Sequence, residues 1–150
     1  MPTAEQMQIL WNLSDSVLYP EAVALIRRLV NEEECLPLPA SQVIRLLNIA
    51  SASSYTDLMR FMRHQRERDW PDAKKDIPLF YTELDKYFTT FKNKRLREHF
   101  PLMQADKPAK EAGQEVDQLM ALLARDFIQH LVTENALLAV KKAAERGKRR

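Results

Sequence analysis

Glycine is scarce in this sequence, with only Gly113 and Gly147 among its 150 residues. Folds built from β-strands turn tightly and often, and glycine is the default residue where a turn needs a positive φ. The scarcity therefore argues against a β-sandwich or a β-barrel. It also excludes the glycine-rich loops that cradle phosphate groups.

Cysteine and long apolar runs are lacking as well. The single cysteine, Cys35, cannot form a disulfide within the chain, and disulfides are typical of oxidising compartments. No run of about 18 apolar residues is present, so no segment is expected to span a membrane. The first residues, MPTAEQMQILW, have neither the basic leader nor the apolar segment of a secretory signal. We therefore expect a cytoplasmic protein without a membrane partner.

Apolar residues recur at helical spacing along the whole chain, and no segment alternates convincingly as a strand does. At this length one domain is expected, and the pattern predicts an all-α, single-domain helical bundle of five or six helices. These helices lie in an acidic N-terminal part (3–34), a basic middle part (40–98) and a long C-terminal helix (about 109–146) with a basic tail. The connectors CLPLP (35–39) and SASS (51–54) separate helices.

The pattern also predicts details of the helices and of the core. Pro20 suits the first turn of a helix, so a second helix is expected to begin there, and residues 101–108 are expected to form a loop. Trp11 and Leu137 lie in apolar stripes and are expected to be buried. The widest stripe, more typical of a core than of an exposed surface, consists of Phe80, Tyr81, Leu84, Tyr87, Phe88 and Phe91.

Charge is unevenly distributed, although the formal net charge is only +2. Residues 1–39 hold two basic and six acidic side chains, whereas residues 40–110 hold fourteen basic and nine acidic ones. The final residues, 139–150, hold six basic side chains and one acidic. Such asymmetry indicates the kind of partner that a chain binds rather than its fold.

The stretch RFMRHQRERDW (60–70) concentrates cations on one side of a helix. When the helix is projected at 100° per residue, its apolar side chains face the core and the cations cover most of the remaining surface. Arg63 and Glu67 are the nearest pair of opposite charge at the i, i+4 spacing, and the other arginines lack such a partner within the helix. Guanidinium groups suit phosphate. The candidate nucleic-acid contacts on this helix are Arg60, Arg63, His64, Arg66 and Arg68.

A second basic cluster lies at the end of the next helix and consists of Lys92, Lys94, Arg95 and Arg97. If the clusters align, they form a surface that follows a phosphate backbone. A solvated basic face neutralised by nearby acids is the alternative interpretation. Tyr55 and Trp70 border the basic helix, where they either stack on unpaired bases or, as Trp70 before a proline suggests, cover the core.

No catalytic, metal or cofactor motif is present. The three histidines have no cysteine or histidine at metal-ligand spacing, and Asp126 with His130 is typical of a surface ion pair. Cys35 has no basic neighbour that would lower the pKa of its thiol. The sequence has no nucleophile elbow, HExxH or Walker motif. We therefore expect a protein that is not an enzyme and that takes no cofactor, metal or small-molecule substrate.

The segment ASQVIRLLNIASASSYTDLMRFMRHQRERDW, followed by LFYTELDKYF, resembles the small helical subunit of type III CRISPR effector complexes. The resemblance covers about residues 40–90. One helix starts with a Ser/Thr-Gln-x-x-Arg pattern, and the following helix ends with a Gln-x-x-Arg pattern. The residues that carry these patterns are Ser41, Gln42, Arg45, Gln65 and Arg68.

The resemblance implies a non-catalytic RNA-binding subunit of a CRISPR ribonucleoprotein complex for antiviral defence. Its basic side chains would hold the backbone of the guide–target duplex, while base pairing would supply the specificity. The implied partners are RNA, other subunits of the complex and further copies of the chain, stacked acidic head to basic body. On matching positions the implied contacts are Arg45, Arg60, Arg63 and Arg68.

Two other functions remain open. A helical protein–protein interaction module, such as an adaptor or an antitoxin-like regulator, would expose part of the aromatic stripe. A DNA-binding regulator would use the helices on either side of SASS as a helix-turn-helix. Salt separates the first alternative from phosphate binding, because phosphate contacts weaken steeply as the salt concentration rises.

Overall fold

The computed structural model describes residues 2–100 and 109–148, and within these residues it contains helices, turns and connectors but no strand. The predicted all-α class is confirmed. In chain order the elements are α1 (Ala4–Leu13), η1 (Ser14–Leu18), α2 (Tyr19–Arg27), η2 (Arg28–Glu32), α3 (Ala40–Ala52), α4 (Tyr55–Glu67), η3 (Asp72–Lys74), α5 (Asp76–Thr90), η4 (Phe91–Arg95), α6 (Leu96–His99) and α7 (Ala109–Lys148).

The first four elements form one continuous helical stretch. Pro20 lies in the first turn of α2, as predicted, but no break separates α2 from the turn before it. Thr3 starts the stretch with a capping box, in which Thr3 Oγ1 accepts from the Gln6 N–H and the Gln6 side chain accepts from the Thr3 N–H. Proline has no N–H to donate, and inside a regular helix it also crowds the preceding turn. Here Pro20 follows η1, a π-helical turn whose hydrogen bonds already span an extra residue. The helix therefore continues through the proline.

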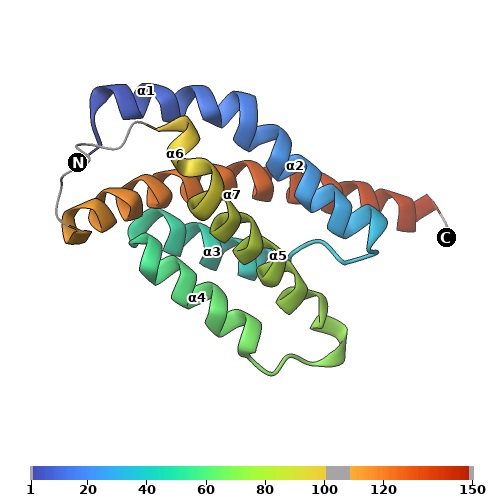
Figure 1. Ribbon diagram of the computed structural model, residues 1–150. Helices are drawn as coiled ribbons and strands as arrows, with labels where there is room; N and C mark the ends of the chain where they lie inside the picture. The colour runs from blue at the N-terminus through green and yellow to red at the C-terminus, as the bar shows by residue number, and fades with distance from the viewer. Residues whose placement is uncertain (1, 101–108, 149–150) are drawn as a thin grey trace.

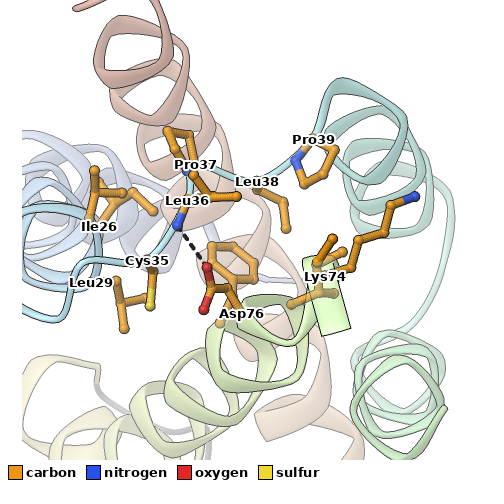
Figure 2. A pocket seen from close by; sticks show the side chains of 13 residues that line it. Ile26, Leu29, Cys35, Leu36, Pro37, Leu38, Pro39, Lys74 and Asp76 are labelled. Carbon is orange, nitrogen blue, oxygen red and sulfur yellow. Dashed lines mark hydrogen bonds between the residues drawn. The ribbon is translucent and has the colours of Figure 1, made fainter. Parts of the chain in front are cut away.

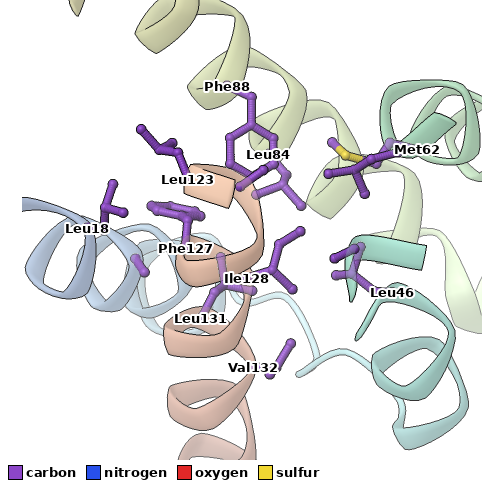
Figure 3. Packing of buried hydrophobic residues seen from close by; sticks show 14 of the residues in the cluster. Leu18, Leu46, Met62, Leu84, Phe88, Leu123, Phe127, Ile128, Leu131 and Val132 are labelled. Carbon is purple, nitrogen blue, oxygen red and sulfur yellow. The ribbon is translucent and has the colours of Figure 1, made fainter. Parts of the chain in front are cut away.

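The long helix α7 runs through the middle of the bundle, with α1 and α2 crossing one side of it and α3 and α4 lying on the other (Figure 1). It contacts η1, α2, α3 and α4 directly. Figure 3 shows its side chains Leu123, Phe127 and Leu131 among apolar side chains of the surrounding helices. A fully buried stripe on one helix thus serves as the common core for the others.

The aromatic stripe of α5 and η4 faces this core, as predicted. Phe80, Phe88 and Phe91 are buried, and the half-buried Tyr87 ring stacks on Phe127 of α7 with 4.0 Å between ring centroids. Stacked and edge-on aromatic contacts add to the stabilisation from area burial. The stripe is therefore core rather than an exposed docking surface.

Two expected core residues are exposed, and both predictions were wrong. The α1 helix buries Gln6, Leu10 and Leu13, so Trp11 points about 100° away from Leu10 and is 58% exposed. Leu137 is 60% exposed whereas the next residue, Leu138, is buried, so Leu137 lies on the outer face of α7. Apolar spacing alone does not decide which face of a helix its neighbours cover.

The connectors are largely as predicted. Ser54, the last residue of SASS, accepts from the Asp57 N–H and caps α4 as predicted. The turn is shorter than predicted, because Ser51 and Ala52 still belong to α3. CLPLP links η2 to α3, and the Asn135 side chain of α7 bonds both the N–H (2.8 Å) and the carbonyl (3.1 Å) of Leu38. The loop predicted for 101–108 lies outside the described residues. No described helix is both long and apolar enough to cross a membrane.

Candidate nucleic-acid interface

A polar cleft lies between α4 and α5 and contains much of the predicted basic surface. We call it the α4–α5 cleft. Its cations come from both predicted clusters, because α4 packs against α5 and so brings the basic end of one helix beside the other. The lining residues are Tyr55, Thr56, Met59, Arg60, Arg63 and Arg66 of α4, Asp85 and Thr89 of α5, Lys92 and Asn93 of η4, and Asp117 of α7.

Three of the four cations in this cleft face a carboxylate. Arg66 contacts Asp85 at 2.7 Å, and Arg60 contacts Asp57 of the first helical turn at 3.0 Å. Lys92 lies 3.9 Å from Asp117. The interpretation that neighbouring acids neutralise the basic face is therefore correct for part of the cleft. The remaining positive charge is smaller than the sequence alone indicated.

Arg63 is the exception among the cleft cations. It is exposed, and within the described residues no carboxylate lies within ion-pairing distance of its guanidinium, so the expected contact with Glu67 is not formed. An arginine without an internal partner keeps its five N–H donors for an external ligand. The middle of the α4 basic face therefore presents one available guanidinium between two that are held by acids.

Lys92 is held in place from two sides. Its ammonium lies 5.4 Å from the centre of the Tyr55 ring, which adds a cation–π contact to the distant Asp117 carboxylate. Burial, with Asp85 and Asp117 as additional causes, raises the pKa of the Tyr55 hydroxyl to about 12. Tyr55 is buried, so it supports the cleft from below and does not present its ring to a base.

A second hollow continues the cleft along α7. Lys92, Asn93 and Asp117 border both hollows, and the second one also reaches Arg97 and Gly113. Arg97 is exposed. Five of the ten predicted contacts therefore lie along one surface, namely Arg60, Arg63, Arg66, Lys92 and Arg97.

The other five predicted contacts lie outside the cleft. Arg45 and His64 are exposed on α3 and α4, and Lys94 is exposed on η4. The Arg68 guanidinium lies over the ring of Trp70, 4.3 Å from its centre. Arg95 forms a bidentate ion pair with Glu21 on the opposite side of α5.

Trp70 and the two glutamines of the sequence patterns, Gln42 and Gln65, are buried and contribute to the interior of the bundle. Trp70 is buried and its Nε1–H donates to the Gln65 carbonyl at 2.7 Å, so it covers the core. Gln42 is buried and accepts from the Tyr81 hydroxyl at 3.0 Å. Gln65 is also buried, and its Oε1 has no partner among the described residues. Both glutamines of the family-like patterns therefore face inward.

The basic C-terminal tail does not join the cleft. About 24 residues separate Asp117 from Lys141, which corresponds to roughly 36 Å along the α7 axis. Lys141 and Arg146 are exposed at the far end of the helix, and residues 149–150 lie outside the described part of the chain. The tail is thus a separate basic surface.

Sequence reasoning missed the acids of the cleft. Asp85 lies on α5 and Asp117 on α7, both distant from α4 in the sequence, so no local pattern predicts that they lie beside α4. Asp57 could have been found, because it lies three residues before Arg60 and this spacing brings two side chains together on a helix. The i, i+4 spacing alone does not identify this pair, because Asp57 and Arg60 are three residues apart.

A different polar cluster joins η1 to α7. Ser14 Oγ lies 2.9 Å from His130 Nε2, and the Tyr19 ring meets His130 edge-on. Burial raises the pKa of Asp126, while His130, Arg125 and a hydrogen bond from Ser14 partly oppose the shift. Across the described residues, no group of three or more His, Cys, Asp or Glu side chains lies close enough to hold a metal ion.

No protein-family model matches the chain, and neither a curated protein nor a solved structure matches it. The class of protein therefore rests on the fold and the cleft alone: the chain is an all-α helical bundle with a partly neutralised basic cleft.

Proposed function

We propose that this chain is a non-catalytic, RNA-binding small subunit of a CRISPR ribonucleoprotein effector complex. The observation that carries the proposal is the α4–α5 cleft, in which Arg63 and Arg66 of α4 come together with Lys92 of η4. Backbone binding needs several cations along one path rather than a shaped pocket for a base. The family-like segment over residues 40–90 supports an RNA partner.

In this proposal the cleft holds phosphates without reading sequence, and a guide–target duplex supplies the specificity by base pairing. Arg63 makes the first contact because it has no internal ion pair to break. Arg66 and Arg60 contribute when phosphate competes with Asp85 and Asp57 for their guanidinium groups. Thr56 and Asn93 supply neutral donors beside them.

The partners proposed with this role are other subunits of the complex and further copies of the chain, in the cytoplasm. Within one copy, Glu34 after η2 already lines one hollow with Lys142 and Arg146 of α7. A head-to-tail contact between copies would therefore join the other acidic residues of the N-terminal helices to the basic face of α4.

The experiment is a fluorescence-anisotropy titration of single-stranded RNA, duplex RNA and duplex DNA at about 50 and 200 mM salt, a range over which phosphate contacts weaken measurably. The wild type is compared with Arg60→Glu/Arg63→Glu. The matched control is Lys141→Glu/Lys142→Glu, which changes the net charge equally at the far end of α7. Circular dichroism verifies that each variant is folded.

Salt-sensitive RNA binding that the cleft variant loses and the α7 variant retains supports the proposal. Equal losses in both variants indicate attraction by net charge alone and contradict it. Absence of binding at low salt also contradicts it for the isolated chain.

A helical protein-interaction module is the second candidate function. The observation in its favour is a set of exposed large apolar side chains on separate helices, which are Trp11, Tyr19, Ile44, Leu137 and Val140. A helix-turn-helix regulator is less well supported, since the first turn of α4 carries Asp57 where a recognition helix would approach DNA phosphates.

A further inference from the structure

A small apolar pocket lies beneath the CLPLP connector, outside the α4–α5 cleft (Figure 2). Leu29 of η2, Leu38 of the connector and Phe80 of α5 form parts of its wall. Its volume is about 70 Å³, whereas pockets for drug-sized ligands occupy about 300–1,000 Å³. The space therefore suits one short aliphatic group rather than a metabolite.

The wall of this pocket is fixed by hydrogen bonds on both sides of Pro37. The Leu36 N–H donates to Asp76 Oδ2 of α5 at 2.9 Å. Asn135 of α7 holds the N–H and the carbonyl of Leu38. Because α5 and α7 both anchor the connector, the pocket exists before any ligand arrives, and binding would require little ordering of the chain.

The mouth of the pocket combines apolar surface with negative charge. Leu36 is 53% exposed beside the opening. The carboxylates of Glu33 and Asp76 lie near enough to Cys35 to add to the effect of burial in raising the pKa of its thiol. Lys74 also contributes to the wall, but Figure 2 shows its ammonium directed away from Asp76. A cationic group at the opening would meet the carboxylate of Asp76, which lines the pocket, with Glu33 nearby.

We propose that this pocket receives one aliphatic side chain of a partner protein, and that a lysine or arginine adjacent in the partner's sequence meets Glu33 and Asp76. The pocket volume selects the size of the anchoring group, and the two carboxylates select the neighbouring charge. Leu36 would extend the apolar contact around the anchor. This docking site goes beyond the proposed function, because it lies outside the α4–α5 cleft and uses no residue of it.

The test is a selection of short random peptides, displayed on phage, against three forms of the protein. Ala73 lines the pocket and is exposed, so Ala73→Met is expected to fill the opening without unfolding the chain. Ala144→Met places the same side chain on the exposed end of α7 as a control. We expect enriched peptides to share an aliphatic residue beside lysine or arginine, and to bind the wild type and Ala144→Met but not Ala73→Met.

The charge requirement is measured with an enriched peptide and Glu33→Gln/Asp76→Asn, in which Asn can still accept from Leu36. We expect the affinity to fall about fivefold at low salt, in line with partly exposed charge pairs. Enrichment without a basic residue, or equal binding to Ala73→Met, would overturn the proposal. If no peptide is enriched while 3-methylbutylamine raises the melting temperature of the wild type alone, the pocket takes a small amphiphilic cation and not a protein.

Discussion

Glu21 of α2 and Arg95 of η4 form a bidentate ion pair across the bundle, with Arg95 Nη2 2.8 Å from Glu21 Oε2. The Tyr87 hydroxyl donates to the same carboxylate at 3.0 Å, and the Arg95 guanidinium also lies over the Phe91 ring. An arginine that the sequence offers as a nucleic-acid contact thus holds two helices together. Two arginines of the same basic cluster therefore differ in role: Arg95 forms an internal ion pair, whereas Arg97 is exposed.

The ion pair is expected to contribute to stability above mildly acidic pH. Arg95, then Tyr87, lowers the pKa of Glu21 below its ordinary value of 4.5 against the opposing effect of burial. A lowered folded-state pKa stabilises the fold above the unfolded value, and this contribution is lost as the pH falls through the folded value. The free energy of unfolding from urea titrations at several pH values between neutral and about 3 measures it.

Arg95→Ala is expected to cost about 1–2 kcal/mol at neutral pH, from the bidentate pair and the contact with Phe91. It should also flatten the acid limb of the stability curve. Arg97→Ala, two residues further along an exposed face, is the control and should change stability by less than about 0.5 kcal/mol. Similar losses in both variants would show that the ion pair does not stabilise the bundle.

Asp85→Asn is expected to strengthen nucleic-acid binding. It removes a negative charge from the α4–α5 cleft and loosens the hold on Arg66. The affinity should rise about threefold at low salt. This factor corresponds to the Coulomb repulsion that is removed between the carboxylate and a phosphate about 6 Å away in water. Anisotropy titrations measure it, with Asp72→Asn in the exposed η3 as a control of equal charge change. An unchanged or lower affinity for Asp85→Asn would argue against phosphate in this cleft.

Asn135→Ala is expected to destabilise the fold by about 1–3 kcal/mol, because the buried N–H of Leu38 loses its acceptor. The connector carbonyl loses its donor in the same variant. Chemical denaturation provides the measurement, and Asn48→Ala on the exposed face of α3 provides the control. A loss for Asn135→Ala no larger than that for Asn48→Ala would mean that the connector does not depend on α7.

Glu34→Gly is expected to stabilise the protein. Glu34 has a φ of 56°, the left-handed conformation that ends many helices and favours glycine. Relief of that strain outweighs the extra freedom of glycine in the unfolded chain, for a net gain of about 0.5–1 kcal/mol. Glu33 has a φ of −96°, so Glu33→Gly should lower stability instead. Thermal melts of the two neighbours give opposite signs if the backbone conformation is the cause.

The local signals in the sequence predicted most of the elements. Ser54 before α4 and Thr3 before α1 offered the side-chain caps that their backbones use, and the prolines of CLPLP excluded a helix there. Pro20 was correctly predicted for the first turn of α2, but a proline preceded by a π-helical turn does not interrupt the helical stretch before it. Trp11 misled because a stripe of apolar residues can be wider than the face that its neighbours cover.

For the cleft, the sequence by itself determined which cations stand on the exposed side of α4, since helical periodicity fixes the direction of each side chain relative to the core. Only the tertiary structure decided which of them are available. The carboxylates of Asp85 and Asp117 and the partner of Arg95 come from other helices, and an ion pair depends on the distance between atoms rather than on separation along the chain. Packing therefore left Arg63 open, turned Arg95 inward and brought Lys92 to the cleft.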